Sequence, residues 1–266
     1  MTHPRIVVNE VCSPALPLAD QITWWQRAGA TSVGLARFRR EHGGWQPAVT
    51  RIMDAGINIG YLMHAPMFRL AEPESWPGAV QALADSIDVA AKLRIPTIYT
   101  TTGPRGRLSF EEAAVALAEA YAPVREHAGK SGVRMLVETA NPLFAHTHFL
   151  HSLPDTVRVA RQAGLGVCLD VHAIWAESAL EAGIRDAGPL TGLVQVSDFV
   201  PGNLTVTRDV IGEGVIPIEE MLRTTLDTGY QGLFDLELFA RPAATALEDT
   251  RTSIERLGEI LGRLGA

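Results

Sequence analysis

Short segments rich in β-branched and other apolar residues alternate with longer amphipathic segments along the chain. The short segments predict eight strands, at Arg5–Val11, Thr31–Ala36, Ile57–Met63, Thr97–Thr101, Val133–Glu138, Gly166–Asp170, Leu193–Ser197 and Gly232–Leu238. Between them, apolar residues recur at the spacing of a helix face, most clearly over Ala79–Leu93 and Glu111–His127. This alternation is typical of β/α units, which assemble into a parallel sheet.

Capping signals mark where several of the predicted helices begin and end. Ser109 stands three residues before Glu112, as in a capping box, and Ser152 with Pro154 opens a helix that ends at Ala163. Glycines suited to the left-handed residue that ends a helix follow four predicted helices, at Gly29, Gly56, Gly164 and Gly229. The repeated helix ends indicate a chain built from similar β/α units.

These units predict an α/β fold, a single (β/α)8 TIM barrel domain that spans residues 1–266. No linker or low-complexity tract divides the chain. Hydrophobic residues make up 47% and aromatic residues 6% of the sequence, so we expect an aliphatic core. Loops after strands form the catalytic face of such barrels, and the longest candidates are Thr102–Leu108, Thr139–Leu153 and Phe199–Ile216.

The charge balance argues against polyanionic partners. The chain has 30 acidic and 23 basic residues and a formal net charge of -7, which disfavours nucleic acid and anionic membranes as partners. Cys12 and Cys168 lie in apolar, strand-like segments and are expected to be reduced core residues. Because the sequence shows no export signal and no long apolar stretch, we expect a cytoplasmic protein.

Polar residues end four consecutive predicted strands: Glu138, Asp170, Gln195 and Glu237. Neighbouring strands lie about 5 Å apart, so inward-facing groups at these ends converge within reach of one small ion. Three adjacent carboxylates would repel one another and raise one another's pKa unless a cation neutralised them. The bland alternative is that each acid caps a helix or pairs with an arginine. Four such residues on successive strands favour one divalent metal ion.

The donor atoms narrow the identity of the ion. Two glutamates, an aspartate and a glutamine carbonyl form an all-oxygen set, which suits Mn²⁺ or Mg²⁺ better than Zn²⁺. Asp198 is an alternative to Gln195, since both stand near the end of the seventh strand. Alternation places Gln195 and Ser197 on one face of that strand and Asp198 on the other.

The motifs that carry these residues resemble those of the xylose-isomerase-like superfamily of sugar isomerases and epimerases. The matching segments are Val137-Glu138, Leu169–His172, Val194–Asp198, Gly212–Pro217 and Asp235–Glu237. The resemblance spans nearly the whole chain. It implies a barrel with one bound metal ion and, by analogy, a homodimer or homotetramer.

Within that superfamily the chain is similar to the hydroxypyruvate isomerase branch, which is the reason for preferring Gln195 as the ligand from the seventh strand. That branch has histidine three residues after the aspartate, whereas His172 stands two residues after Asp170. In the related enzymes, carboxylates beside the metal move protons, so Glu138 and Glu237 are candidates for proton transfer in addition to binding metal. The alternative is that both only bind metal and that water or His172 moves the protons. The resemblance also makes His172, Asp198 and Glu213 candidates for substrate binding.

Other residues could contribute to a site. His64 ends the third predicted strand and is expected to face the pocket and bind a substrate oxygen. His146, His148 and His151 are interpreted as lid or surface residues, with a second metal as the alternative. Trp175 could wall a pocket or pack in the core, and Arg105 and Arg107 could bind an anion or be solvated. The Gly212-Glu213-Gly214 turn lacks the dinucleotide-binding pattern, so no nucleotide cofactor is expected.

The chemistry favours an isomerase or epimerase that acts on a small hydroxy-carbonyl or keto-sugar substrate through a metal-stabilised enediolate. A lyase or dehydratase that uses the same enolate chemistry is the main alternative. The abasic-site endonuclease branch shares the fold, but the acidic charge and the few histidines at strand ends disfavour it. A binding protein without catalysis would leave the predicted metal site without a role.

Overall fold

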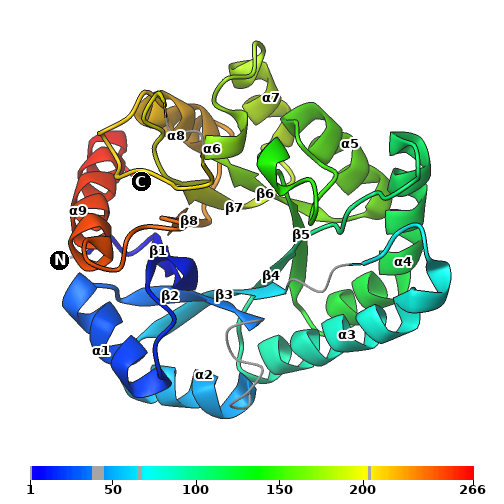
Figure 1. Ribbon diagram of the computed structural model, residues 1–266, viewed down its shortest axis with the longest axis horizontal. Coiled ribbons are helices and arrows are strands. Elements are labelled where there is room, and N and C mark those ends of the chain that lie inside the picture. Colours follow the sequence, from blue (N-terminus) through cyan, green and yellow to red (C-terminus); the bar gives the residue numbers. More distant parts are fainter. Residues whose placement is uncertain (1, 38–44, 65–67, 203–204) are drawn as a thin grey trace.

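The fold is a closed barrel of eight parallel strands with helices around it (Figure 1). A computed structural model describes residues 2–37, 45–64, 68–202 and 205–266. Each strand pairs with its neighbours in chain order, and the last pairs with the first. The strands are β1 (Ile6–Asn9), β2 (Ser32–Ala36), β3 (Asn58–His64), β4 (Thr97–Thr100), β5 (Arg134–Glu138), β6 (Gly166–Asp170), β7 (Thr191–Val196) and β8 (Leu233–Leu236). The predicted (β/α)8 barrel is confirmed.

Helices follow the strands and cover the outside of the barrel. They are α1 (Leu18–Ala28), α2 (Trp45–Asp54), α3 (Trp76–Lys92), α4 (Phe110–Lys130), α5 (Leu153–Ala163), α6 (Val171–Ile174), α7 (Leu180–Ala187), α8 (Ile218–Asp227) and α9 (Ala246–Leu264). Short 3-10 turns lie at η1 (Glu10–Cys12), η3 (Pro73–Ser75) and η4 (Pro142–Phe144). The Ser109 capping box is present, and Gly29 and Gly164 end their helices in the left-handed conformation. No described helix is long and apolar enough to cross a membrane.

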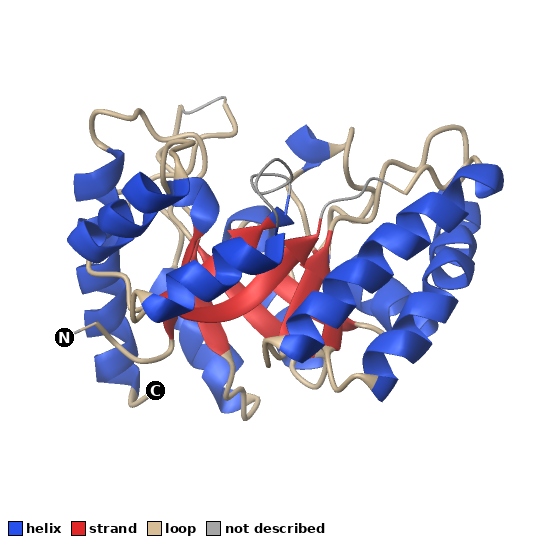
Figure 2. Ribbon diagram, turned by 90° about the horizontal axis from the view of Figure 1, so that it is seen from below, coloured by secondary structure: helices blue, strands red, loops and turns tan. Residues whose placement is uncertain are grey.

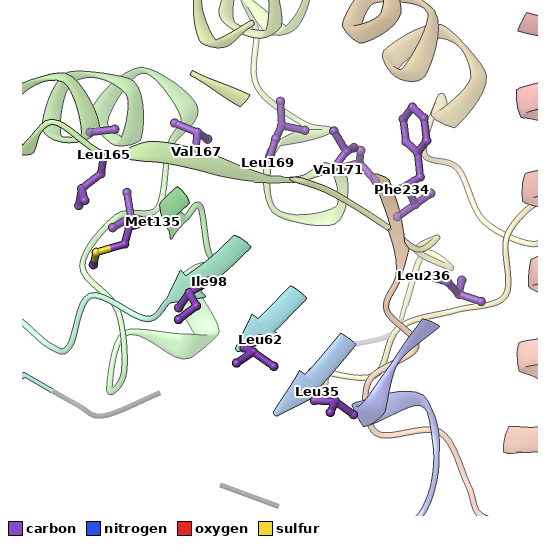
Figure 3. Packing of buried hydrophobic residues seen from close by; sticks show 14 of the residues in the cluster. Leu35, Leu62, Ile98, Met135, Leu165, Val167, Leu169, Val171, Phe234 and Leu236 are labelled. Carbon is purple, nitrogen blue, oxygen red and sulfur yellow. The ribbon is translucent and has the colours of Figure 1, made fainter. Parts of the chain in front are cut away.

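Apolar side chains on the two faces of the strands form two separate clusters. Leu35, Leu62 and Ile98 point outward and pack in the main core under the helices, as Figure 3 shows. A smaller cluster fills the barrel interior with Val7, Tyr61, Tyr99, Leu136, Cys168 and Leu193. Cys12 and Cys168 are both buried and neither forms a disulfide, in agreement with the sequence prediction.

Gly34 makes room for an aromatic side chain inside the barrel. A Cβ atom built at this position would lie 1.8 Å from Cζ of Tyr61, so any larger residue would collide with the ring. The rings of Tyr61 and Tyr99 lie 5.3 Å apart and form a floor below the barrel mouth. The loops that follow the strands gather on one side of the barrel, and both chain ends lie towards the other (Figure 2).

Candidate active site

Three of the four predicted metal-binding residues meet at the carboxyl ends of the strands. Side chains alternate along a strand, so a residue two positions after an interior residue also faces inward. Glu138 and Asp170 follow the interior residues Leu136 and Cys168 in this way. Glu237 follows β8 directly. One carboxylate oxygen from each of the three acids lies within 4.8 Å of the other two.

Gln195 on β7 lies beside this cluster and is fully buried. Its Nε2 donates to Oε1 of Glu237 at 3.1 Å and to Oδ2 of Asp235 at 3.4 Å. Its carbonyl Oε1 has no hydrogen-bond partner among the described residues. A buried carbonyl without a partner is costly, and a cation beside the carboxylates would satisfy it. The donor set therefore fits an oxygen-coordinated divalent ion.

Arg208, from the loop between β7 and α8, reaches the same cluster. Its Nη2 lies 2.8 Å from Oδ2 of Asp170 and 3.4 Å from Oε2 of Glu237. The arginine is only 3% exposed, so its charge acts in a poorly hydrated environment. Three carboxylates and one guanidinium leave two negative charges at the mouth, which a divalent cation would balance.

Burial and mutual repulsion disfavour the ionised form of these acids. Burial raises the pKa of Glu138 well above its ordinary value, and the charges of Glu237 and Asp170 raise it further. Burial raises the pKa of Glu237 to about 7, although Arg208 opposes this rise. Burial alone would lower the pKa of Arg208, but Asp170 and Glu237 hold it above the ordinary value. A bound cation would favour the ionised carboxylates instead.

A cavity of about 300 Å³ opens directly onto the carboxylates. Its lining comes from strand ends and mouth loops: Val11, Met63, Thr101, Glu138, Phe144, His146, Thr147, His148, Arg208, Glu237 and Phe239. Of the three acids, Glu138 and Glu237 line the cavity, whereas Asp170 lies behind them. Two of the predicted enclosing loops, Thr139–Leu153 and Phe199–Ile216, contribute to the lining, and Thr102–Leu108 does not.

The histidines that follow β5 divide into three environments. His148 is buried in the cavity wall, with Nε2 3.7 Å from Oε2 of Glu138. Burial, together with His151 and His146, lowers the pKa of His148 to about 3, which keeps the ring neutral. His146 lines the cavity at an exposed position, and His151 bonds to the carbonyl of Ala140. His146 and His148 therefore line the cavity, and their interpretation as lid residues stays a prediction.

His64 does not face the pocket, and this corrects the expectation from its strand-end position. On β3, Tyr61 and Met63 point into the barrel, so His64 points outward with Leu62. Its Nδ1 lies 2.8 Å from Oγ of Ser86 on α3. Burial lowers the pKa of His64 to about 3. The side chain packs between the sheet and a helix, away from the described cavity lining.

Asp198 organises the loop after β7. Its carboxylate accepts backbone N–H bonds from Phe199 at 2.8 Å, Gly212 at 2.9 Å, Gly214 at 3.0 Å and Ile216 at 3.1 Å. These bonds use both oxygens on the side of the strand opposite to Gln195. Because a loop held at four points has a fixed path, Asp198 helps to place the segment that carries Arg208.

Other residues singled out from the sequence lie outside the described cavity lining. Glu213 is exposed and lies 3.4 Å from Arg256. Neither Glu213 nor Asp198 belongs to the described cavity lining. His172 is 6% exposed and packs edge-on against Phe199 at 5.8 Å, and Trp175 stacks on the same ring. Arg105 and Arg107 are exposed. The substrate contact expected of His172 stays a prediction.

The sequence reasoning missed Arg208 as part of the site. A charge count gives a signal, because three clustered carboxylates exceed the charge of one divalent ion. The segment Phe199–Ile216 contains one arginine and no lysine, so Arg208 is the one residue of this loop that could supply a positive charge to the carboxylates. Its position still depends on the path of a long loop, which no local pattern fixes.

Comparisons with known proteins agree with this architecture. Among solved structures, a protein from Sinorhizobium meliloti 1021 is 22% identical over 97% of this chain and 98% of its own, with a TM-score of 0.83. The IolI protein with a bound zinc atom is 14% identical, covers 98% and 99% of the two chains, and has a TM-score of 0.82. D-psicose 3-epimerase from Clostridium cellulolyticum H10, solved with D-tagatose, is 18% identical over 98% and 95%, with a TM-score of 0.75.

These identities show a shared fold. No functionally curated protein matches the chain at a significant level. The family model described as the xylose isomerase-like TIM barrel matches residues 23–260, which is most of the chain. The resemblance of the sequence motifs to this superfamily is thereby confirmed, and the chain belongs to the xylose isomerase-like TIM barrel family.

Proposed function

We propose that this protein is a divalent-metal-dependent isomerase or epimerase of a small hydroxy-carbonyl or keto-sugar substrate. The observation that carries the proposal is the convergence of three buried carboxylates beside a cavity, next to a glutamine carbonyl that has no partner among the described residues. Membership of the xylose isomerase-like family supports it, as does the fold shared with an epimerase solved with a ketose.

Glu138, Asp170, Gln195 and Glu237 are the residues that would hold the ion. When bound, a divalent cation supplies a Lewis acid that stabilises negative charge developing on neighbouring substrate oxygens. Mn²⁺ and Mg²⁺ suit the all-oxygen donor set. The cavity of about 300 Å³ limits the substrate to a small molecule.

Glu138 and Glu237 are placed for proton transfer because both line the cavity. One carboxylate removes the proton on the carbon beside the substrate carbonyl, and the carbon–hydrogen electron pair enters the enediolate. Return of a proton to the opposite face of that carbon gives an epimer. Return of a proton to the former carbonyl carbon, with transfer of the hydroxyl proton to the former carbonyl oxygen, gives an isomer. Burial raises the pKa of both glutamates, and a bound cation would oppose this rise and favour the ionised form that a base requires.

Arg208 and His148 complete the polar wall of the cavity. The guanidinium of Arg208 lines the cavity, and its N–H groups could hold an anionic substrate oxygen. The neutral His148 lies 3.7 Å from Glu138 and adds no charge to the cavity wall. The apolar remainder of the wall, Val11, Met63, Phe144 and Phe239, excludes water from the reacting carbon.

The test combines metal binding with proton exchange. We expect chelator-treated protein to bind Mn²⁺, which electron paramagnetic resonance detects. We also expect the protein to catalyse exchange of solvent deuterium into an accepted ketose or hydroxy acid, at the carbon beside the carbonyl. A Glu138→Gln and Glu237→Gln double variant should lose both properties. Glu126→Gln is the matched control, because Glu126 is exposed and pairs with Lys130 on the surface of α4.

Each outcome points to one conclusion. Exchange without elimination supports the isomerase or epimerase, whereas an unsaturated product would replace it with a lyase or dehydratase. Mn²⁺ binding by the wild-type protein no tighter than by the double variant would overturn the metal site itself.

A further inference from the structure

A fourth buried acid lies directly below the proposed metal site. Asp235 stands two residues before Glu237, so both side chains point into the barrel. Asp235 is fully buried, whereas Glu237 is 7% exposed and reaches the cavity. A buried carboxylate that is too deep to contact substrate needs another reason to be there, because burying an unpaired charge is costly.

Two amide groups bridge the two acids of β8. The Nδ2 of Asn9 donates to Oδ2 of Asp235 at 3.0 Å and to Oε1 of Glu237 at 3.3 Å. The Nε2 of Gln195 donates to the same two oxygens, at 3.4 Å and 3.1 Å. The remaining oxygen of Glu237, Oε2, faces Arg208 and the cluster.

This arrangement determines which way the Gln195 amide points. In the metal-bound protein, where the cation favours ionised acids, a turned-over amide would place its carbonyl oxygen against two carboxylate oxygens, which repel it and donate nothing to it. The amide nitrogen must therefore point at Asp235 and Glu237, and the carbonyl must point away from them. That carbonyl oxygen is buried and has no partner in the described part of the chain.

We propose that Asp235 is a positioning residue that holds the Gln195 carbonyl oxygen towards the metal ion. The inference rests on the proposed metal site, and it assigns Asp235 a task that contact with substrate does not require. Asp235 acts through the glutamine amide, in the way that buried acceptors orient the side chains of metal ligands. Asn9 supports it, because its own orientation is set by a bond from the Val11 N–H to Oδ1 at 3.1 Å.

A double-mutant cycle on Mn²⁺ affinity tests this role. In the Gln195 background, we expect Asp235→Asn to weaken Mn²⁺ binding by about tenfold to a hundredfold, because an asparagine amide can also donate to a turned-over Gln195 carbonyl and no longer dictates the amide orientation. Gln195→Glu replaces the amide by a carboxylate, which needs no acceptor and is repelled by Asp235. In the Gln195→Glu background, the loss of Mn²⁺ affinity caused by Asp235→Asn should be at least threefold smaller than in the Gln195 background.

Tyr99→Phe is the matched control. The hydroxyl of Tyr99 lies 3.3 Å from the same amide nitrogen, but a hydroxyl can donate or accept and so does not dictate the amide orientation. We expect this variant to change Mn²⁺ affinity by less than about threefold. Asp235→Ser replaces Asp235→Asn if the latter fails to give the wild-type circular dichroism spectrum.

The outcomes separate this inference from the proposed function. One outcome is that the wild-type protein binds Mn²⁺ while Asp235→Asn lowers Mn²⁺ affinity by the same factor, within threefold, in both backgrounds. In that case Asp235 has only a structural role and the inference is overturned. If the wild-type protein binds Mn²⁺ no better than the Glu138→Gln and Glu237→Gln double variant, the metal site and this inference both fall.

Discussion

The two halves of the barrel wall differ in charge. Strands β1–β4 contain no aspartate, glutamate, lysine or arginine, and their inward residues include Asn9, Gly34, Tyr61, Met63 and Tyr99. Strands β5–β8 carry the acids and the glutamine of the proposed metal site at their carboxyl ends or, for Glu237, directly after the last strand residue. The first half supplies an apolar and aromatic surface, and the second half supplies the charges.

This division shows how a barrel can hold several carboxylates together. Adjacent strands bring their ends close enough to share one cation, so the acids need to be neighbours around the barrel. The opposite, uncharged wall keeps water away and strengthens the electrostatic interactions of the cluster. It follows that substitutions in the charged half should affect chemistry most, and those in the uncharged half should affect stability.

The largest expected effect separates two acids of the charged half. Glu138 lines the cavity and Asp170 does not, so only Glu138 is placed to transfer a proton. At saturating Mn²⁺, Glu138→Gln should lower kcat by about a hundredfold to ten-thousandfold. Asp170→Asn should weaken Mn²⁺ binding but recover most of its kcat at saturating metal. Steady-state kinetics over a Mn²⁺ titration measure both, and equal loss of kcat in the two variants would contradict separate roles.

Removing Arg208 tests the charge balance of the same half. Without Arg208, the buried acids lose the guanidinium that lies 2.8 Å from Asp170. We expect Arg208→Gln to destabilise the metal-free protein by about 3 kcal/mol at pH 8, because the carboxylates are left uncompensated. Added Mn²⁺ should stabilise the variant more than the wild-type protein. Urea unfolding with and without Mn²⁺ checks this, and an unchanged free energy of unfolding without metal would argue against it.

In the uncharged half, a substitution should change stability. Gly34→Ala would place a Cβ atom 1.8 Å from the Tyr61 ring, and a fully buried ring has no free space to move into. We expect a loss of about 1–3 kcal/mol in the free energy of urea unfolding. Gly129→Ala in α4 is the control, since nothing lies within 4 Å of its added Cβ. The packing argument fails if both variants unfold at the same urea concentration.

The strand ends of the charged half were predictable from the sequence because parallel strands obey simple rules. An apolar run that ends in an acid, repeated on neighbouring strands, predicts both the barrel and the convergence of Glu138, Asp170 and Glu237. Helix ends were predictable for the same reason, since the capping box at Ser109 and the left-handed glycines are local signals.

Residues placed by long-range contacts were not predictable. Arg208 reaches the cluster because Asp198 binds four backbone N–H groups, and because Arg241 pairs with Asp209 at 3.1 Å. Those contacts join segments that only the folded loop brings together. The sequence also gave no way to see that Asp235 and Gln195 share hydrogen bonds across two strands.

The smallest expected effect concerns His64, which the strand-end rule placed on the wrong side. A position at the end of a strand leaves two directions open, and the neighbouring Met63 takes the inward one. Because burial lowers the pKa of His64 to about 3, the folded protein keeps it neutral while the unfolded chain takes up a proton below its ordinary pKa. Stability from this group is therefore complete above about pH 6.5 and is lost as the pH falls towards 3.

Because His64 lies on the outer face of β3, its replacement should change the pH dependence of stability without changing catalysis. Between pH 6.5 and 5.5, the wild-type protein should lose roughly 1 kcal/mol more stability than His64→Gln, measured by urea unfolding at each pH. Glutamine keeps a polar group near Ser86, which lies 2.8 Å from the ring. A large loss of kcat in His64→Gln would place the residue back in the site, because a side chain behind the wall has no direct path to the substrate.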